Sequence, residues 1–299
     1  MIGELAAIAA AFCFAVAATV YRRPLMSTSA VSASIVRFTS TGAILVGIVL
    51  ALWGFAPYTA LAPQIVMLTM ASGMVGLGVG DVLYMTGFKL VGVARTVGLV
   101  ATYPMFSLGL EVVLGREEVL PHAAAGAATI LVGVWLLMHR GAGREPVVSR
   151  DTMRRGAIAG LSTAFLYSVA MILLDEALAS MASAGIEGAF ALNALRTASG
   201  GMLLLLAAPL ADREHGFLKL DRHSVALLLL GSLIAYGVGW YLLTWGFILA
   251  PAALVVPLSS ITPLFATVTA VVFLRERLST KGIIGVLLIV AGVLVLVVG

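Results

Sequence analysis

The chain has few charged residues. Asp, Glu, Lys and Arg make up 11% of its 299 residues, whereas soluble domains carry about 25%. Hydrophobic residues make up 61% of the chain. So few charges cannot cover a surface that faces water, and the composition therefore predicts a membrane protein.

Residues that support metal or nucleophilic chemistry are also scarce. The single cysteine, Cys13, excludes an intramolecular disulfide and a cysteine-rich metal site. The four histidines lie in connections without an HExxH or i,i+4 pattern, and neither a phosphate-binding loop nor a GxSxG elbow occurs. We therefore expect no enzymatic activity, no cofactor and no metal. The sequence contains no Lys/Arg-rich stretch interleaved with aromatic residues, and we therefore do not expect nucleic acid as a partner. The first residues lack the basic region of a cleaved signal peptide.

Long apolar runs fill most of the chain. A spanning helix needs about 20 mostly apolar residues. The alternating ten-residue pattern of a membrane barrel is missing. The sequence therefore predicts an all-α membrane protein with ten transmembrane helices. The ten windows are 2–20, 31–53, 64–88, 95–114, 120–138, 156–177, 187–209, 222–247, 251–274 and 280–298.

The two halves of the chain repeat one another. From the second window onward, adding 159 to a position finds a matching residue: Arg37 meets Arg196, Pro104 meets Pro263 and Gly126 meets Gly285. The first window matches at an offset of 153. Each half has five spans, an odd number, so the halves must be inverted, as in secondary transporters. The predicted units are residues 1–138 and 156–299, joined by a basic linker at 139–155.

Basic residues are distributed unevenly among the connections. The odd-numbered connections carry 15 Lys and Arg, and the even-numbered connections and termini carry only Arg116. The positive-inside rule places the odd-numbered connections in the cytoplasm. We therefore predict a multi-pass protein of the cell membrane with both termini outside the cytoplasm.

An aspartate lies within the third span, in the stretch LGVGDVLYMTGF. The repeat breaks here, because Asp81 meets Trp240 in the second half. An ionised group in a bilayer is costly and usually has a partner. Arg37 and Asp81 both lie about 10 Å from the same membrane face at 1.5 Å per residue. In one interpretation the pair lines a cavity, where it binds a charged or zwitterionic substrate or exchanges partners during transport. In the other it is a buried ion pair that fixes helix register.

Further residues are candidates for the same site. Arg196, on the opposite side of the midplane, is either a substrate ligand or a structural donor to carbonyl groups. Glu111 is a second carboxylate that either couples transport to an ion or reaches the interface. Glu117 and Glu276 are expected to stabilise the N-terminus of the last helix of each half. The aromatic candidates for contact with substrate, with packing as the alternative, are Tyr84, Tyr103, Tyr236 and Trp240.

The chain resembles the drug/metabolite transporter superfamily, in its ten-helix EamA-type group. The resemblance rests on YPMFSLGLEVVLGREEVL in the first half and on ITPLFATVTAVVFLRERLSTKGIIGVLLIVAGVLVLV in the second. Such proteins move amino acids, sugars, nucleotide sugars, lipid-linked sugars or drugs. They usually keep both termini in the cytoplasm, which is opposite to the prediction from charge.

The leading hypothesis is a secondary transporter of small polar metabolites, such as amino acids, that works by alternating access. A multidrug or lipid-linked metabolite exporter of the same fold is the alternative, and a membrane scaffold without transport is a third. The expected partners are a small-molecule substrate, a coupling proton or ion, and the lipid bilayer. A monomer is compatible with this hypothesis. The sequence specifies neither the substrate nor the direction of transport, and it leaves the coupling ion and the oligomeric state open.

Overall fold

A computed structural model describes residues 1–115, 121–138, 149–179, 185–250, 255 and 258–298, and these residues form helices and no strand. Eight helical stretches are long and apolar enough to cross a membrane, and two shorter apolar stretches follow. The first half contains α1 (Ile2–Arg22), α2 (Ala30–Trp53), α3 (Ala56–Thr59), α4 (Pro63–Ser72), α5 (Asp81–Val91), α6 (Val93–Val100), α7 (Tyr103–Val113) and α8 (Pro121–Met138). The second contains α9 (Arg150–Ala179), α10 (Gly185–Ala211), α11 (Arg222–Ser232), α12 (Trp240–Leu249), α14 (Thr262–Leu274) and α15 (Thr280–Val298). The chain is therefore a multi-pass all-α membrane protein, as predicted.

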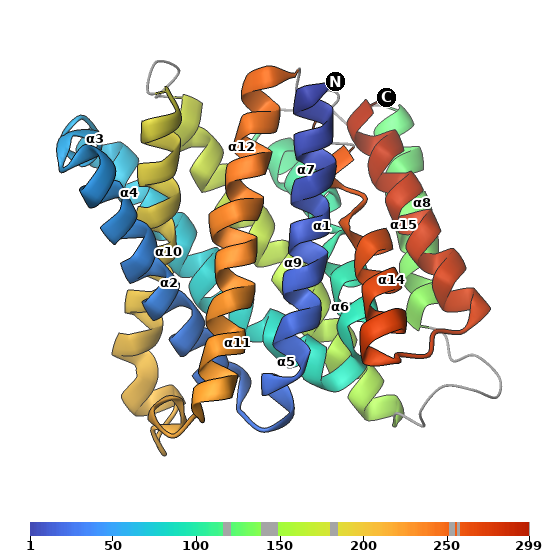
Figure 1. The fold of residues 1–299 in the computed structure, drawn as a ribbon. Helices are drawn as coiled ribbons and strands as arrows, with labels where there is room; N and C mark the ends of the chain where they lie inside the picture. Colours follow the sequence, from blue (N-terminus) through green and yellow to red (C-terminus); the bar gives the residue numbers. More distant parts are fainter. Residues whose placement is uncertain (116–120, 139–148, 180–184, 251–254, 256–257, 299) are drawn as a thin grey trace.

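The last helices of the two halves meet in a way that relates the halves by a two-fold axis. A Cβ on Gly126 of α8 would lie 2.8 Å from the carbonyl oxygen of Gly292, and one on Gly285 of α15 would lie 2.6 Å from that of Gly133. These contacts exchange when 159 is added or subtracted. Positions rise along α8 as they fall along α15, so the helices are antiparallel and lie side by side in Figure 1. Small residues permit this close approach.

Contacts between the other helices of the two halves show the same two-fold relation. α2 packs against α10, its counterpart in the other half. α1 packs against α12 and α14, and α9 packs against the equivalent helices α5 and α7. Each first helix therefore packs against the other half. This confirms the inverted arrangement expected from five spans per half.

The third and eighth spans each contain a π-helical segment at equivalent positions. Gly73–Gly80 (η2) joins α4 to α5, and Leu233–Gly239 (η4) joins α11 to α12. A π-helix widens the turn and leaves backbone groups without their usual partners, and such segments are common at functional sites. Here Asn193 Nδ2 donates to the carbonyl oxygen of Tyr236 at 2.8 Å. Both segments end next to the positions of Asp81 and Trp240.

The fourth span is interrupted in mid-membrane. α6 ends at Val100, and α7 begins at Tyr103 with Pro104 in its first turn, where the missing N–H of proline costs no helical hydrogen bond. Ser168 Oγ donates to the Tyr103 carbonyl oxygen at 2.7 Å. Pro263 opens α14 in the same way. Discontinuous helices of this kind form the binding sites of many secondary transporters.

Both termini lie on one face of the bundle, and the connections after α1, α10 and α14 lie on the opposite face (Figure 1). This agrees with the predicted grouping of the odd-numbered connections. Which face is cytoplasmic stays a prediction. Of the predicted linker, only residues 149–155 lie within the described ranges.

One expectation for this face was wrong. Glu276 lies before α15 and does not stabilise its N-terminus. Its carboxylate instead accepts hydrogen bonds from the N–H groups of Val93, at 2.7 Å, and Ala94, at 3.1 Å. It thus caps α6 of the other half and joins the two halves at the face opposite the termini. Glu117 lies outside the described residues.

Candidate functional site: a cavity between the two halves

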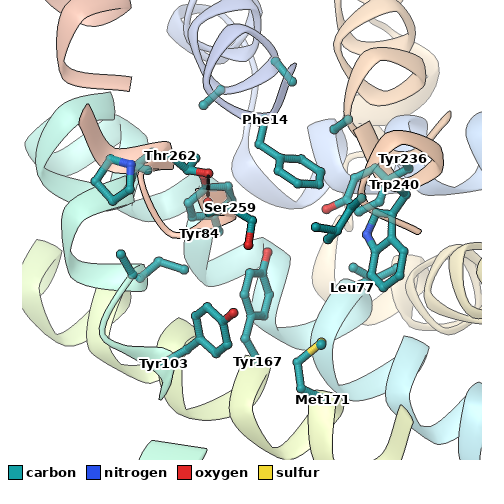
Figure 2. A pocket seen from close by; sticks show the side chains of 18 of the residues that line it. Phe14, Leu77, Tyr84, Tyr103, Tyr167, Met171, Tyr236, Trp240, Ser259 and Thr262 are labelled. Carbon is teal, nitrogen blue, oxygen red and sulfur yellow. Dashed lines mark hydrogen bonds between the residues drawn. The ribbon is translucent and has the colours of Figure 1, made fainter. Parts of the chain in front are cut away.

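A cavity of about 240 Å³ lies in the middle of the bundle, between the two halves (Figure 2). Its lining comes from α1, α2, η2, α5, α6 and α7 of the first half and from α9, α10, η4, α12 and α14 of the second. The interrupted fourth span contributes Val100, Ala101 and Tyr103. Backbone irregularity is tolerated at membrane depth where it borders such a cavity.

The lining residues occur in pairs that the repeat relates. Most have a counterpart in the other half that also lines the cavity, so the pseudo-two-fold axis passes through it. The pairs are Phe14/Tyr167, Ala18/Met171, Arg37/Arg196, Leu77/Tyr236, Tyr84/Leu243, Val100/Ser259, Ala101/Ser260 and Tyr103/Thr262.

Arg37 forms a buried ion pair on one side of the cavity. Its Nη1 lies 2.7 Å from Asp81 Oδ2, which also accepts a hydrogen bond from Ser34 Oγ at 2.8 Å. Arg37 Nε donates to Ser232 Oγ at 3.2 Å, and the guanidinium lies 3.7 Å from the centroid of the Tyr21 ring. Asp81 Oδ1 is buried without a hydrogen-bond partner among the described residues. The pair is therefore fixed from several sides but leaves one carboxylate oxygen unused.

Arg196 has different surroundings. Its Nε donates to Ser72 Oγ at 3.0 Å, and Ser72 Oγ donates onward to the Ala170 carbonyl oxygen at 2.6 Å. Its guanidinium lies 5.3 Å from the Trp240 ring centroid, within the range of a cation–π interaction. Within the described part of the chain, Arg196 has no carboxylate partner.

Aromatic side chains form much of the remaining wall. Tyr84 lies 6.2 Å from Tyr167 between ring centroids. Figure 2 shows Tyr84, Tyr103 and Tyr167 across the cavity from Tyr236 and Trp240. The hydroxyl groups of Tyr103 and Tyr167 point toward the open space in this view. The cavity therefore offers apolar ring faces together with a few hydroxyl groups.

The structure brings most of the predicted site residues together. Arg37, Arg196, Tyr84, Tyr103, Tyr236 and Trp240 all line the cavity. Asp81 was expected to line it too, but its side chain is fully buried and Arg37 forms that part of the wall. Glu111 is partly exposed near the end of α7, away from the cavity lining. Whether any of these residues binds substrate or an ion stays a prediction.

Sequence reasoning missed several lining residues. Phe14, Tyr21, Tyr167 and Met171 look like ordinary residues of an apolar helix. Their positions could have been found through the repeat, since Phe14 and Tyr167 are equivalent at the offset of 153. A search for register pairs around Arg37 and Arg196 would have included them. Within the described ranges, no group of three His, Cys, Asp or Glu could hold a metal ion.

Comparisons with known proteins agree with this architecture. The model of the EamA-like transporter family matches residues 1–139 and again 154–298. An uncharacterized transporter of Archaeoglobus fulgidus is 25% identical over 298 residues, which cover 99% of this chain and 98% of the relative. A solved crystal structure shares the fold at a TM-score of 0.64 and 21% identity, covering 98% of this chain and 95% of the other. The chain therefore belongs to the EamA-like transporter family.

Proposed function

We propose that this protein is a secondary transporter of small polar, amino-acid-like solutes across the cell membrane. The observation that carries the proposal is the cavity on the axis between two inverted halves, lined by an arginine from each half. Inverted halves can exchange conformations, which opens a central site alternately to the two sides of the membrane. The substrate would bind between Arg37 and Arg196, against the tyrosine faces.

The size and lining of the cavity favour a small solute. Pockets for drug-sized ligands have volumes of about 300–1,000 Å³, and this cavity has about 240 Å³. Two arginines at the wall suit a solute that carries negative charge. The aromatic lining is what favours the alternative, an exporter of apolar drugs or lipid-linked metabolites of the same fold. The volume argues against that alternative.

The Arg37–Asp81 pair is the proposed coupling element. Asp81 has one oxygen with two donors and one oxygen without a partner among the described residues. In the proposed cycle, Asp81 exchanges Arg37 for a proton when the helices move. Glu111 is the second candidate for ion coupling. Its place outside the cavity lining makes it the weaker one.

Counterflow in proteoliposomes tests the proposal. Vesicles with purified protein are loaded with a mixture of amino acids, and uptake of the same radiolabelled amino acids is followed. We expect transient accumulation of label, and we expect Ala101→Phe to abolish it because the new ring fills the cavity. Leu131→Phe is the matched control, since Leu131 is 57% exposed on the outer face of α8.

The same vesicles distinguish the alternatives. Uptake of ethidium, blocked by Ala101→Phe, without counterflow of any amino acid would favour the drug exporter. The absence of any solute movement would refute the transport proposal for amino acids. A pH gradient that drives uptake in the parent protein but not in a variant with Arg37→Gln and Asp81→Asn would support coupling through Asp81.

A further inference from the structure

The two halves differ in the residue that faces the buried arginine of the cavity wall. In the first half, Arg37 pairs with Asp81 at 2.7 Å. In the second half, the equivalent of Asp81 is Trp240, and its ring lies 5.3 Å from the guanidinium of Arg196. In each half, an arginine thus faces the same repeat position, which is residue 81 in the first half and residue 240 in the second. Among the described residues, the counter-ion comes from the first half alone.

The cavity therefore carries one uncompensated positive charge. Arg37 and Arg196 are the charged side chains among the described residues of its lining, and the charge of Arg37 is balanced by Asp81. Arg196 is 5% exposed, and a cation–π contact attracts a cation but does not neutralise it. An unbalanced charge at this depth is costly, so such groups mark binding sites for opposite charge.

The hydrogen bonds of Arg196 leave the outer end of its guanidinium, the Nη1 and Nη2 groups, available for a ligand. Its Nε is held by Ser72, and within the described residues no hydrogen bond joins its terminal Nη1 and Nη2 groups to the protein. These two groups form a fork that matches the two oxygens of a carboxylate. Ser72, itself anchored to Ala170, fixes the direction of the fork.

We propose that Arg196 is the anion subsite of this cavity and that it binds the carboxylate of a monocarboxylate solute. This rests on the proposed function and assigns the charge recognition to Arg196 rather than to the Arg37–Asp81 pair. The opposite part of the solute lies against the aromatic wall that includes Tyr84, Tyr167 and Tyr236. A phosphate ester fits less well, because a second negative charge has no free cation to meet in the described lining.

Thermal unfolding of the purified protein with small probes tests the proposal, since a ligand that binds the folded state raises the Tm. The probes are acetate, butanoate, 4-methylpentanoate and leucine, with 3-methylbutylamine and inorganic phosphate for comparison. We expect a Tm increase with 4-methylpentanoate and leucine that grows with concentration, and none with the amine or phosphate. Stabilisation by none of the carboxylates, or stronger stabilisation by phosphate, would overturn the proposal.

Variants locate the effect. Arg196→Gln should abolish the carboxylate response, and Arg196→Lys should retain part of it. Trp240→Asp should abolish it too, because the new carboxylate gives Arg196 the counter-ion that Asp81 gives Arg37. Leu131→Gln, on the outer face of α8, is the control that should respond fully. A full response in Arg196→Gln would overturn the assignment.

Stability without ligand separates a binding role from a structural one. Arg196→Gln removes an unbalanced charge, so its Tm without probe should equal or exceed that of the parent protein. A clearly lower Tm together with loss of the response would make Arg196 structural and overturn the proposal. If the carboxylates do not raise the Tm but amino-acid counterflow is intact, only the assignment of a carboxylate site to Arg196 is wrong. Failure of counterflow with an intact carboxylate response would remove the transport proposal instead.

Discussion

Removing one charge of the Arg37–Asp81 pair should destabilise the protein severely, whereas removing both charges together should not. The two side chains are 1% and 0% exposed, and Nη1 and Oδ2 lie 2.7 Å apart. At an effective dielectric constant near 20, their attraction is about 6 kcal/mol. Removal of one partner of a buried pair costs about 3–5 kcal/mol, because the remaining charge stays buried and unpaired.

Asp81→Asn and Arg37→Gln should therefore each lower the Tm by roughly 6–10 °C, taking about 2 °C per kcal/mol for a chain of this size. The double variant leaves no unpaired charge and should unfold within about 2 °C of the parent protein. Differential scanning fluorimetry in one detergent measures all four proteins. If Asp81→Asn alone unfolds at the parental temperature, the ion pair does not stabilise the protein, which would contradict this prediction.

Transport by the double variant separates the two interpretations of the pair. If the pair only fixes helix register, stability and gradient-driven uptake should recover together. We expect stability to recover and gradient-driven uptake to stay lost, because Asp81 can no longer exchange Arg37 for a proton.

Three further predictions concern the orientation of the chain and the contacts of two carboxylates. A reporter fused after Gly299 should show the extracytoplasmic phenotype, and a cytoplasmic result would mean that the charge distribution does not set the orientation. Glu276→Ala should cost about 0.5–2 kcal/mol in unfolding measurements, because two N–H groups at the start of α6 lose their acceptor. Burial disfavours ionisation of Asp212, but hydrogen bonds from the Phe217 N–H and the Ser32 hydroxyl outweigh it and hold its pKa below the usual value. This carboxylate therefore contributes stability above about pH 4 that is lost as the pH falls through the lowered pKa. Asp212→Asn should be less stable at neutral pH and should lose less stability on acidification.

The fold could be predicted from the sequence because two strong signals agree. Apolar length defines the spans, and the constant offset of 159 relates Gly126 and Gly133 to Gly285 and Gly292, which then meet across the axis. The interruption before Pro104 could be expected as a kink. The π-helical segments could not, because they depend on how neighbouring helices such as α10 satisfy freed carbonyl groups.

The site was predictable in part. Charge within a span pointed to Arg37, Asp81 and Arg196, and helix rise placed the first two at one depth, where they form the ion pair. The rise per residue gives only the depth of a side chain in the membrane. It could not show that Arg37 rather than Asp81 reaches the cavity, because the direction of a side chain depends on the rotation of its helix. Tyr167 carries no charge or unusual spacing, so only its repeat partner Phe14 could have identified it.

Labelling of a thiol in the central cavity measures directly whether solute reaches the two-fold axis, and the single cysteine of the chain makes the measurement simple. In a Cys13→Ala protein, Ala101→Cys places a thiol in the cavity wall and Leu131→Cys places one on the outer face. We expect a membrane-impermeant thiol reagent to modify position 101 in sealed vesicles, and we expect amino acids to slow this reaction without affecting modification at position 131. Modification of position 101 at one unchanged rate, whatever amino acid is present, would contradict a solute site on the two-fold axis.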